Sequence, residues 1–142
     1  MTVRWFDALS RVLVSAGLVI TGYVHVDLYG HGYRVIHVIG PGFLVQAAVS
    51  FALAALVLVG PWTLRVAAAL LGLGSVAAFV LSRTTGLFGF SETGWEPVPQ
   101  AALALAAEVV VVLACLASLA VEGRWRARGI SDGVRPVTSS GG

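Results

Sequence analysis

One carboxylate interrupts the most apolar part of the chain, and it is the residue best placed to do chemistry. Glu108 lies about ten residues inside an apolar run that extends over residues 98–121. At about 1.5 Å per helical residue this depth is about 15 Å, close to the middle of a bilayer. A carboxylate there costs at least about 2.5 kcal/mol. Glu108 is therefore expected to be protonated, paired or exposed to a polar cavity.

Each of the other apolar runs can place one polar side chain at a similar depth. The same arithmetic places Ser15, Gln46 and Ser75 about 12 to 15 Å from the ends of their runs. We predict that these residues and Glu108 form a buried polar layer in which Glu108 is hydrogen-bonded to Gln46. Such a layer could orient the helices only, handle a proton or a ligand, or contact a polar residue of a partner.

Three histidines between the first two apolar runs are the second candidate for chemistry. His25, His31 and His37 lie there together with Asp27, and imidazole with carboxylate can bind Zn, Cu or Fe. Steps of six residues do not share a helix face, so a metal site needs a bend at residues 30–32. The two outer histidines could also bracket a haem. The alternatives are interfacial histidines with ordinary hydrogen bonds, or contact with a quinone or a lipid headgroup.

Charged side chains in the two polar segments between apolar runs can join these segments. Arg34 lies in the first segment, and Arg83, Glu92 and Glu96 lie in the second. We expect ion pairs among these four residues, with Asp27 as a further acceptor. Because exposed ion pairs contribute only about 0–1 kcal/mol, such pairs would fix loop geometry more than stabilise the fold.

The composition determines which elements must position these residues. Hydrophobic residues make up 58% of the 142-residue chain and charged residues only 11%, which excludes both a soluble and a disordered protein. Because the apolar runs do not alternate with polar residues, they predict spanning helices and not strands. The fold class is therefore an all-α four-helix transmembrane bundle over residues 1–121. The predicted helices cover about 8–24, 38–59, 64–81 and 98–121, and a basic, then disordered, tail covers 122–142.

The distribution of arginine predicts the orientation of the bundle. Two arginines, Arg34 and Arg83, lie on one predicted side of the membrane, and seven lie on the other. The seven are Arg4, Arg11, Arg65, Arg124, Arg126, Arg128 and Arg135. The positive-inside rule then places both termini in the cytoplasm. The basic residues follow membrane topology, so we expect the lipid bilayer and no nucleic acid as a partner.

Two segments carry a resemblance to known proteins. Residues 25–47 read HVDLYGHGYRVIHVIGPGFLVQA and residues 81–97 read LSRTTGLFGFSETGWEP, followed by a helix that contains Ala107-Glu108. This pattern resembles a family of small four-helix membrane proteins of high-GC actinobacteria, and more loosely DoxX-type proteins, which are linked to membrane redox chemistry. The resemblance implies the fold and a location in a bacterial plasma membrane, and it transfers no catalytic residue.

Three functions are compatible with these patterns. No nucleophile triad, nucleotide loop or zinc-protease motif occurs, so no catalytic residue is assigned and an enzyme is not expected. The first hypothesis is an accessory or structural subunit that binds a membrane-protein partner or a second copy of itself. The second is a redox, metal-binding or haem-binding membrane protein that uses the outer-loop histidines. The third is a small proton-coupled carrier that acts as an oligomer through Glu108.

Overall fold

Four long helices form the protein, which is described here by a computed structural model covering residues 2–133, with side chains over residues 5–125. The helices are α1 (Thr2–Gly30), α2 (Ile39–Val57), α3 (Trp62–Arg83) and α4 (Gln100–Gly133). A short 3-10 helix, η1 (Tyr33–Val35), lies between α1 and α2. No strand occurs within residues 2–133, where Leu87 and Phe90 form one isolated bridge. The predicted all-α class is confirmed.

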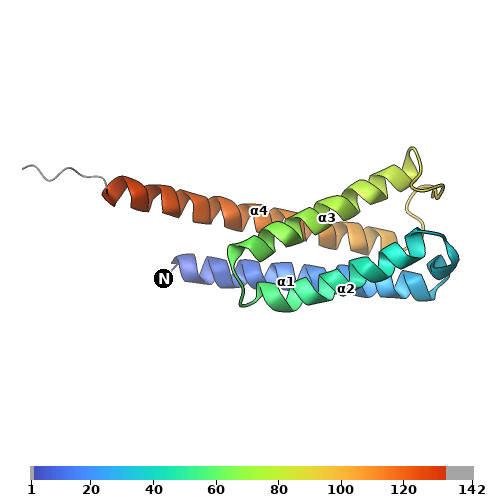
Figure 1. Ribbon diagram of the computed structural model, residues 1–142, viewed down its shortest axis with the longest axis horizontal. Coiled ribbons are helices and arrows are strands. Elements are labelled where there is room, and N and C mark those ends of the chain that lie inside the picture. The colour runs from blue at the N-terminus through green and yellow to red at the C-terminus, as the bar shows by residue number, and fades with distance from the viewer. Residues whose placement is uncertain (1, 134–142) are drawn as a thin grey trace, which may run out of the picture.

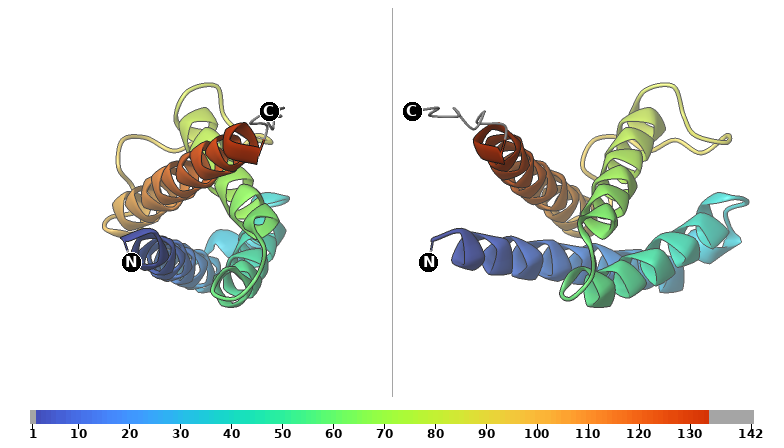
Figure 2. Two further views of the ribbon diagram at one scale, coloured as in Figure 1. Left: turned by 90° about the vertical axis from the view of Figure 1, so that its left-hand side faces the viewer. Right: turned by 60° about the vertical axis from the view of Figure 1, so that its left-hand side comes forward.

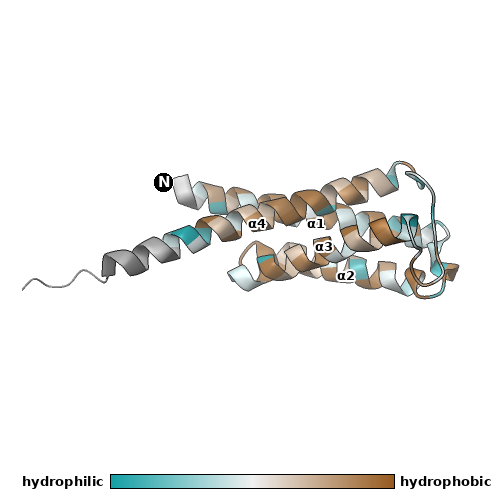
Figure 3. Ribbon diagram, turned by 90° about the horizontal axis from the view of Figure 1, so that it is seen from above, coloured by the Kyte–Doolittle hydropathy of each residue, from teal (hydrophilic) through white to brown (hydrophobic). Residues whose placement is uncertain are grey.

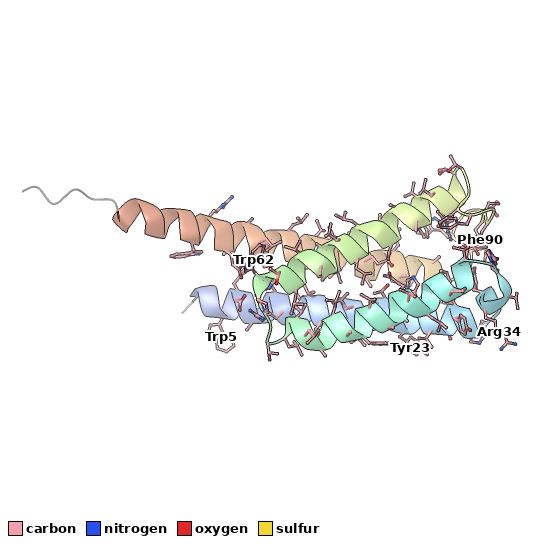
Figure 4. All side chains as sticks on the ribbon, viewed as in Figure 1. Trp5, Tyr23, Arg34, Trp62 and Phe90 are labelled. Atoms are coloured by element: carbon pink, nitrogen blue, oxygen red, sulfur yellow. The ribbon has the colours of Figure 1, made fainter. Side chains whose placement is uncertain are left out.

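All four helices are long and apolar enough to cross a membrane. Hydrophobic residues run along most of each helix, whereas hydrophilic residues gather mainly towards the ends of the molecule (Figure 3). Trp5 is 72% exposed and lies near one end of the molecule, and Trp62 begins α3 towards the same end (Figure 4). Length and composition thus support a multi-pass membrane protein with tryptophans near the ends of its spans.

Consecutive helices run in opposite directions, so the bundle has two distinct ends (Figure 1). The terminal end holds the start of α1, the end of α4 and the tight turn between α2 and α3. The loop end holds η1 and the connection over residues 84–99. Helix α1 packs along α2 and α4, and α4 also packs along α3. Helices α2 and α3 leave their shared turn and diverge towards the loop end (Figure 2).

The first helix is longer than its apolar run, which corrects the predicted boundaries. The sequence predicted a helix over residues 8–24 followed by a loop, but α1 continues through residues 25–30. Hydropathy marks where the apolar surface ends, whereas a helix ends where the backbone turns. The turn follows at Gly32, whose φ of 122° favours glycine.

The fourth helix likewise continues beyond its apolar run. It extends to Gly133, so residues 122–133 of the predicted tail are helical. The remainder of that predicted tail, residues 134–142, lies outside the described residues.

Glycine lets α4 approach two neighbouring helices closely. A Cβ atom added at Gly17 of α1 would lie 2.6 Å from Cγ2 of Val111, and one added at Gly72 of α3 would lie 2.9 Å from Cγ2 of Val112. Lipid offers no hydrophobic force between helices, so close backbone packing of this kind supplies much of their attraction. Gly17 of α1 and Gly72 of α3 therefore allow close packing against α4 of the same chain.

Candidate functional site

A cavity of about 390 Å³ lies between the helices at the loop end. Residues of α2 and α3 form much of its wall, and side chains of α1, α4, η1 and the 84–99 connection complete it. Its size lies in the range of small-molecule sites, about 300–1,000 Å³. The side chains around it are mainly apolar. The polar and charged groups among them are His25, Tyr33, Gln46, Ser75, Ser82, Arg83, Glu92 and Glu108.

The carboxyl group of Glu108 lies at the floor of this cavity. Glu108 is 3% exposed, and the hydroxyl of Thr21 donates a hydrogen bond to its Oε1 over 3.0 Å. Ser75 of α3 lies within interaction range of the same carboxyl group. None of the ion pairs between described side chains includes Glu108. Glu108 thus has hydroxyl neighbours on two helices and no cationic partner in this part of the chain.

His25 extends the same polar group along α1. Its Nδ1 lies 2.8 Å from the backbone oxygen of Thr21. A carbonyl oxygen only accepts hydrogen bonds, so Nδ1 carries the hydrogen, and Nε2 of the neutral ring keeps a lone pair. The ring meets Phe43 edge to face, with 5.0 Å between centroids. His25 therefore faces the interior of the bundle and not an outer loop.

Gln46 contributes a buried donor that the protein leaves unused. Its Nε2 is fully buried and has no hydrogen-bond partner among the described residues. The predicted hydrogen bond between Glu108 and Gln46 is wrong, because Thr21 occupies that role. Both side chains nevertheless line one cavity. An unpaired amide donor inside a protein costs about 1–3 kcal/mol.

The depth predicted for the polar residue of the first helix is wrong, and this error explains why the sequence indicated Ser15 and not Thr21. Because α1 ends at Gly30, Thr21 is nine residues from the loop end and Ser15 is fifteen. Glu108 is eight residues from the start of α4, so it is level with Thr21. Ser15 instead donates to the backbone oxygen of Ala54 over 2.8 Å, outside the cavity.

The sequence contained a signal for this arrangement. Thr21 and His25 are four residues apart, so they share one face of a helix, and both interrupt an apolar stretch. The same helical geometry explains why His25 and His31 do not act together. They are six residues apart, so the helix turns by about 240° between them and places His31 on another face.

The predicted metal site is not formed by these histidines. Among the described residues, no three His, Cys, Asp or Glu side chains lie close enough to hold a metal ion. His25 faces the cavity, whereas His31 is exposed and its Nδ1 lies 3.2 Å from Oδ1 of Asp27. His37 is also exposed. A site with three of these ligands is therefore wrong.

A cluster of three side chains lines the loop-end side of the cavity, which we call its mouth. In this mouth cluster the Tyr33 hydroxyl donates to Oε1 of Glu92, and Arg83 Nη2 donates to Oε2 of Glu92 over 3.0 Å. The guanidinium of Arg83 also lies 3.8 Å from the centroid of Phe79. Tyr33 stacks on Phe43 with 5.1 Å between centroids. The cluster joins η1 to the 84–99 connection.

The predicted ion pairs between the outer loops are thus partly replaced. Arg83 pairs with Glu92, but Glu96 offers Arg83 only its backbone oxygen. Arg34 is exposed, forms none of the ion pairs between described side chains, and lies at the periphery of the loop end (Figure 4). Tyr33, and not Arg34, connects the two loops through its hydrogen bond to Glu92. Residue types alone favoured an arginine for that role because they do not show that Tyr33 faces inward.

The mouth cluster leads to a prediction on alkaline titration. Burial and then the hydrogen bond to Glu92 raise the pKa of Tyr33 above its ordinary value of 10.0. The folded protein holds this proton more tightly than the unfolded chain. Its contribution to stability is therefore complete below the ordinary pKa and is lost as the pH rises through the folded pKa. We expect Glu92→Gln to lower the pH at which Tyr33 ionises.

The measurement is an ultraviolet titration of phenolate absorbance. Subtracting the curve of Tyr33→Phe isolates Tyr33 in the native protein, and subtracting Glu92→Gln/Tyr33→Phe isolates it in the variant. Identical Tyr33 curves in the two backgrounds would contradict the role of Glu92.

A second charged cluster lies at the terminal end, where the sequence indicated only topology. Arg65 is 1% exposed, and its guanidinium binds the carboxylates of Asp7 on α1 and Glu122 on α4. Arg11 also pairs with Asp7 over 2.8 Å and donates to the backbone oxygens of Val57 and Gly60. These oxygens lack helical partners because α2 ends there. This terminal charge cluster ties all four helices together.

Comparison of the chain with family models, with curated proteins and with solved structures finds no match. The resemblance to actinobacterial and DoxX-type membrane proteins stays a prediction.

Proposed function

We propose that this protein resides in a bacterial plasma membrane and binds a lipophilic small molecule in the cavity at its loop end. The observation that carries the proposal is the unpartnered amide nitrogen of Gln46, a residue that lines the mainly apolar cavity of about 390 Å³. A ligand atom that accepts this hydrogen bond would remove the cost of burying the amide. Apolar walls with a few converging polar groups are typical of small-molecule sites.

The packing on the terminal side of the cavity favours a protein that binds a ligand over one that transports it across the membrane. The buried cluster there includes Leu18 of α1, Leu53 of α2, Ala68 of α3 and Val111 of α4. Because these residues separate the polar floor from the terminal end, a ligand would enter and leave on the same side. This favours a binding subunit over the proton-coupled carrier. A subunit that holds a lipophilic ligand for a membrane partner would also fulfil the accessory role expected from the sequence.

Two glycines allow a direct test of the cavity. Gly42 and Gly74 both line it, and a Cβ atom added at either meets no other atom within 4 Å. Gly74→Leu should therefore fill the cavity without disturbing the helices. We expect the purified native protein to retain a lipophilic molecule that Gly74→Leu retains at least about tenfold less, a difference of about 1.4 kcal/mol.

The measurement is mass spectrometry of lipophilic compounds extracted from protein purified in native-membrane nanodiscs. The matched control is Gly123→Leu, because Gly123 is exposed on α4, has open space around it and lies outside the cavity. An equal set of extracted compounds from the native protein and Gly74→Leu would refute the proposal.

We also propose that both termini lie in the cytoplasm. The terminal end carries Arg11, Arg65 and Arg124, whereas the loop end carries Arg34 and Arg83, and the arginine-rich side of a membrane protein faces the cytoplasm. An impermeant maleimide should label Ser91→Cys in intact cells, because Ser91 is exposed in the 84–99 connection. Gly123→Cys should be labelled only after lysis, with both variants made in a Cys115→Ala background. The reverse pattern would contradict this orientation.

A further inference from the structure

We infer that the ligand is a lipophilic phenol, a class that includes quinols, and that its hydroxyl group reaches the floor of the cavity. The inference rests on the proposed function and adds the chemistry of the ligand head. It follows from the hydrogen-bonding capacity that the floor leaves unused and from the aromatic wall above it.

The floor offers both a hydrogen-bond donor and hydrogen-bond acceptors. It is therefore complementary to a ligand group that can both accept and donate a hydrogen bond. Gln46 Nε2 requires an acceptor. His25 keeps a lone pair on Nε2, because Nδ1 already donates to the backbone of Thr21. The carboxyl group of Glu108 has lone pairs beyond the one that Thr21 uses. A hydroxyl group accepts one hydrogen bond and donates another, and therefore satisfies both sides of the floor.

Other head groups satisfy only part of this inventory. A ketone or an ether accepts from Gln46 but gives nothing to His25 or Glu108. An ammonium group donates to these acceptors but leaves the amide donor unpaired. A carboxylate has no hydrogen to donate to His25 or Glu108, and Arg83, the arginine that lines the cavity, is already paired with Glu92. Among these head groups, the hydroxyl group alone both accepts from Gln46 and donates to His25 or Glu108.

The wall above the floor is aromatic and favours a flat ring. The rings of His25, Phe43, Tyr33 and Phe90 follow one another from the floor to the mouth, with 5.0, 5.1 and 5.9 Å between successive centroids. Aromatic rings prefer offset-stacked and edge-to-face partners at such distances. A hydroxyl group on an aromatic ring thus matches the wall and the floor together, which an aliphatic alcohol does not.

The experiment measures binding of tritiated para-octylphenol to the protein in nanodiscs, with empty nanodiscs as background. Unlabelled para-octylphenol, para-octylanisole and decanol are the competitors. The anisole has the same ring and chain but cannot donate a hydrogen bond. We expect octylphenol to compete at about tenfold lower concentration than octylanisole, which is the effect of about one hydrogen bond. Decanol should compete still less well because it lacks the ring.

Two variants link the preference to the floor. Gln46→Leu should weaken octylphenol binding about tenfold and leave folding intact, because its amide nitrogen has no partner in the protein. Glu108→Leu should reduce the preference for octylphenol over octylanisole. Ser15→Ala is the matched control, because Ser15 is also a polar residue within a spanning helix but lies outside the cavity. It should bind octylphenol as the native protein does.

The outcomes separate this inference from the proposed function. If Gly74→Leu abolishes binding while octylphenol and octylanisole compete equally, the phenol inference fails and the cavity remains a ligand site. If tetraphenylphosphonium displaces octylphenol at a lower concentration than any phenol, and does so only with Glu108 present, the ligand is a lipophilic cation and the inference is overturned. If Gly74→Leu binds octylphenol normally, both proposals fail.

Discussion

Replacing Arg65 with leucine is expected to lower the free energy of unfolding by about 3 kcal/mol, because the hydrogen bonds from one buried guanidinium to two carboxylates are lost. Arg65 is 1% exposed and binds Asp7 and Glu122, which belong to different helices. Without the guanidinium, both carboxylates would face each other and apolar side chains with no shared cation. The measurement is equilibrium unfolding in mixed detergent micelles, followed by circular dichroism.

The control for this prediction is Arg124→Leu. Arg124 also lies at the terminal end but is exposed, so its replacement should change stability by less than about 0.5 kcal/mol. Asp7 keeps its ion pair with Arg11, whereas Glu122 loses the cation that it binds. Glu122→Gln should therefore restore part of the stability when added to Arg65→Leu. Native-like stability of Arg65→Leu alone would show that the cluster contributes nothing to the fold.

Gly17→Leu is expected to destabilise the protein by roughly 2 kcal/mol or more, because it forces α1 away from α4. The new Cβ would lie 2.6 Å from Cγ2 of Val111 and 3.3 Å from the backbone oxygen of Ala107. Valine has a stiff side chain and the carbonyl belongs to a helix, so neither can move aside easily. The same unfolding measurement in detergent micelles tests this prediction.

Gly74→Leu is the matched control for Gly17→Leu. It makes the same substitution in a spanning helix but at a residue that lines the cavity, where an added Cβ atom meets nothing within 4 Å. Its stability should match that of the native protein. If the two variants were equally stable, close packing between α1 and α4 would have no energetic role.

The amino-acid sequence alone determined the class of the fold. With 58% hydrophobic and 11% charged residues, the chain cannot form a water-exposed surface. Four apolar runs without alternation had to become helices, because backbone groups in lipid need partners within their own segment. The depth of Glu108, Gln46 and Ser75 followed from the same helical arithmetic, and the structure places all three around one cavity.

Only the tertiary structure decided which groups meet. Thr21 and not Gln46 donates to Glu108, because the true end of α1 sets its register against α4. In the sequence Arg65 indicated only topology. In the structure it is buried and pairs with Asp7 of α1 and Glu122 of α4, because α3 places it between these helices. Hydropathy reports how deep a residue lies but not which way it faces. The direction in which a side chain points depends on where its helix ends, on the angle at which helices cross and on the rotation of each helix. These arise from contacts between segments far apart in the chain.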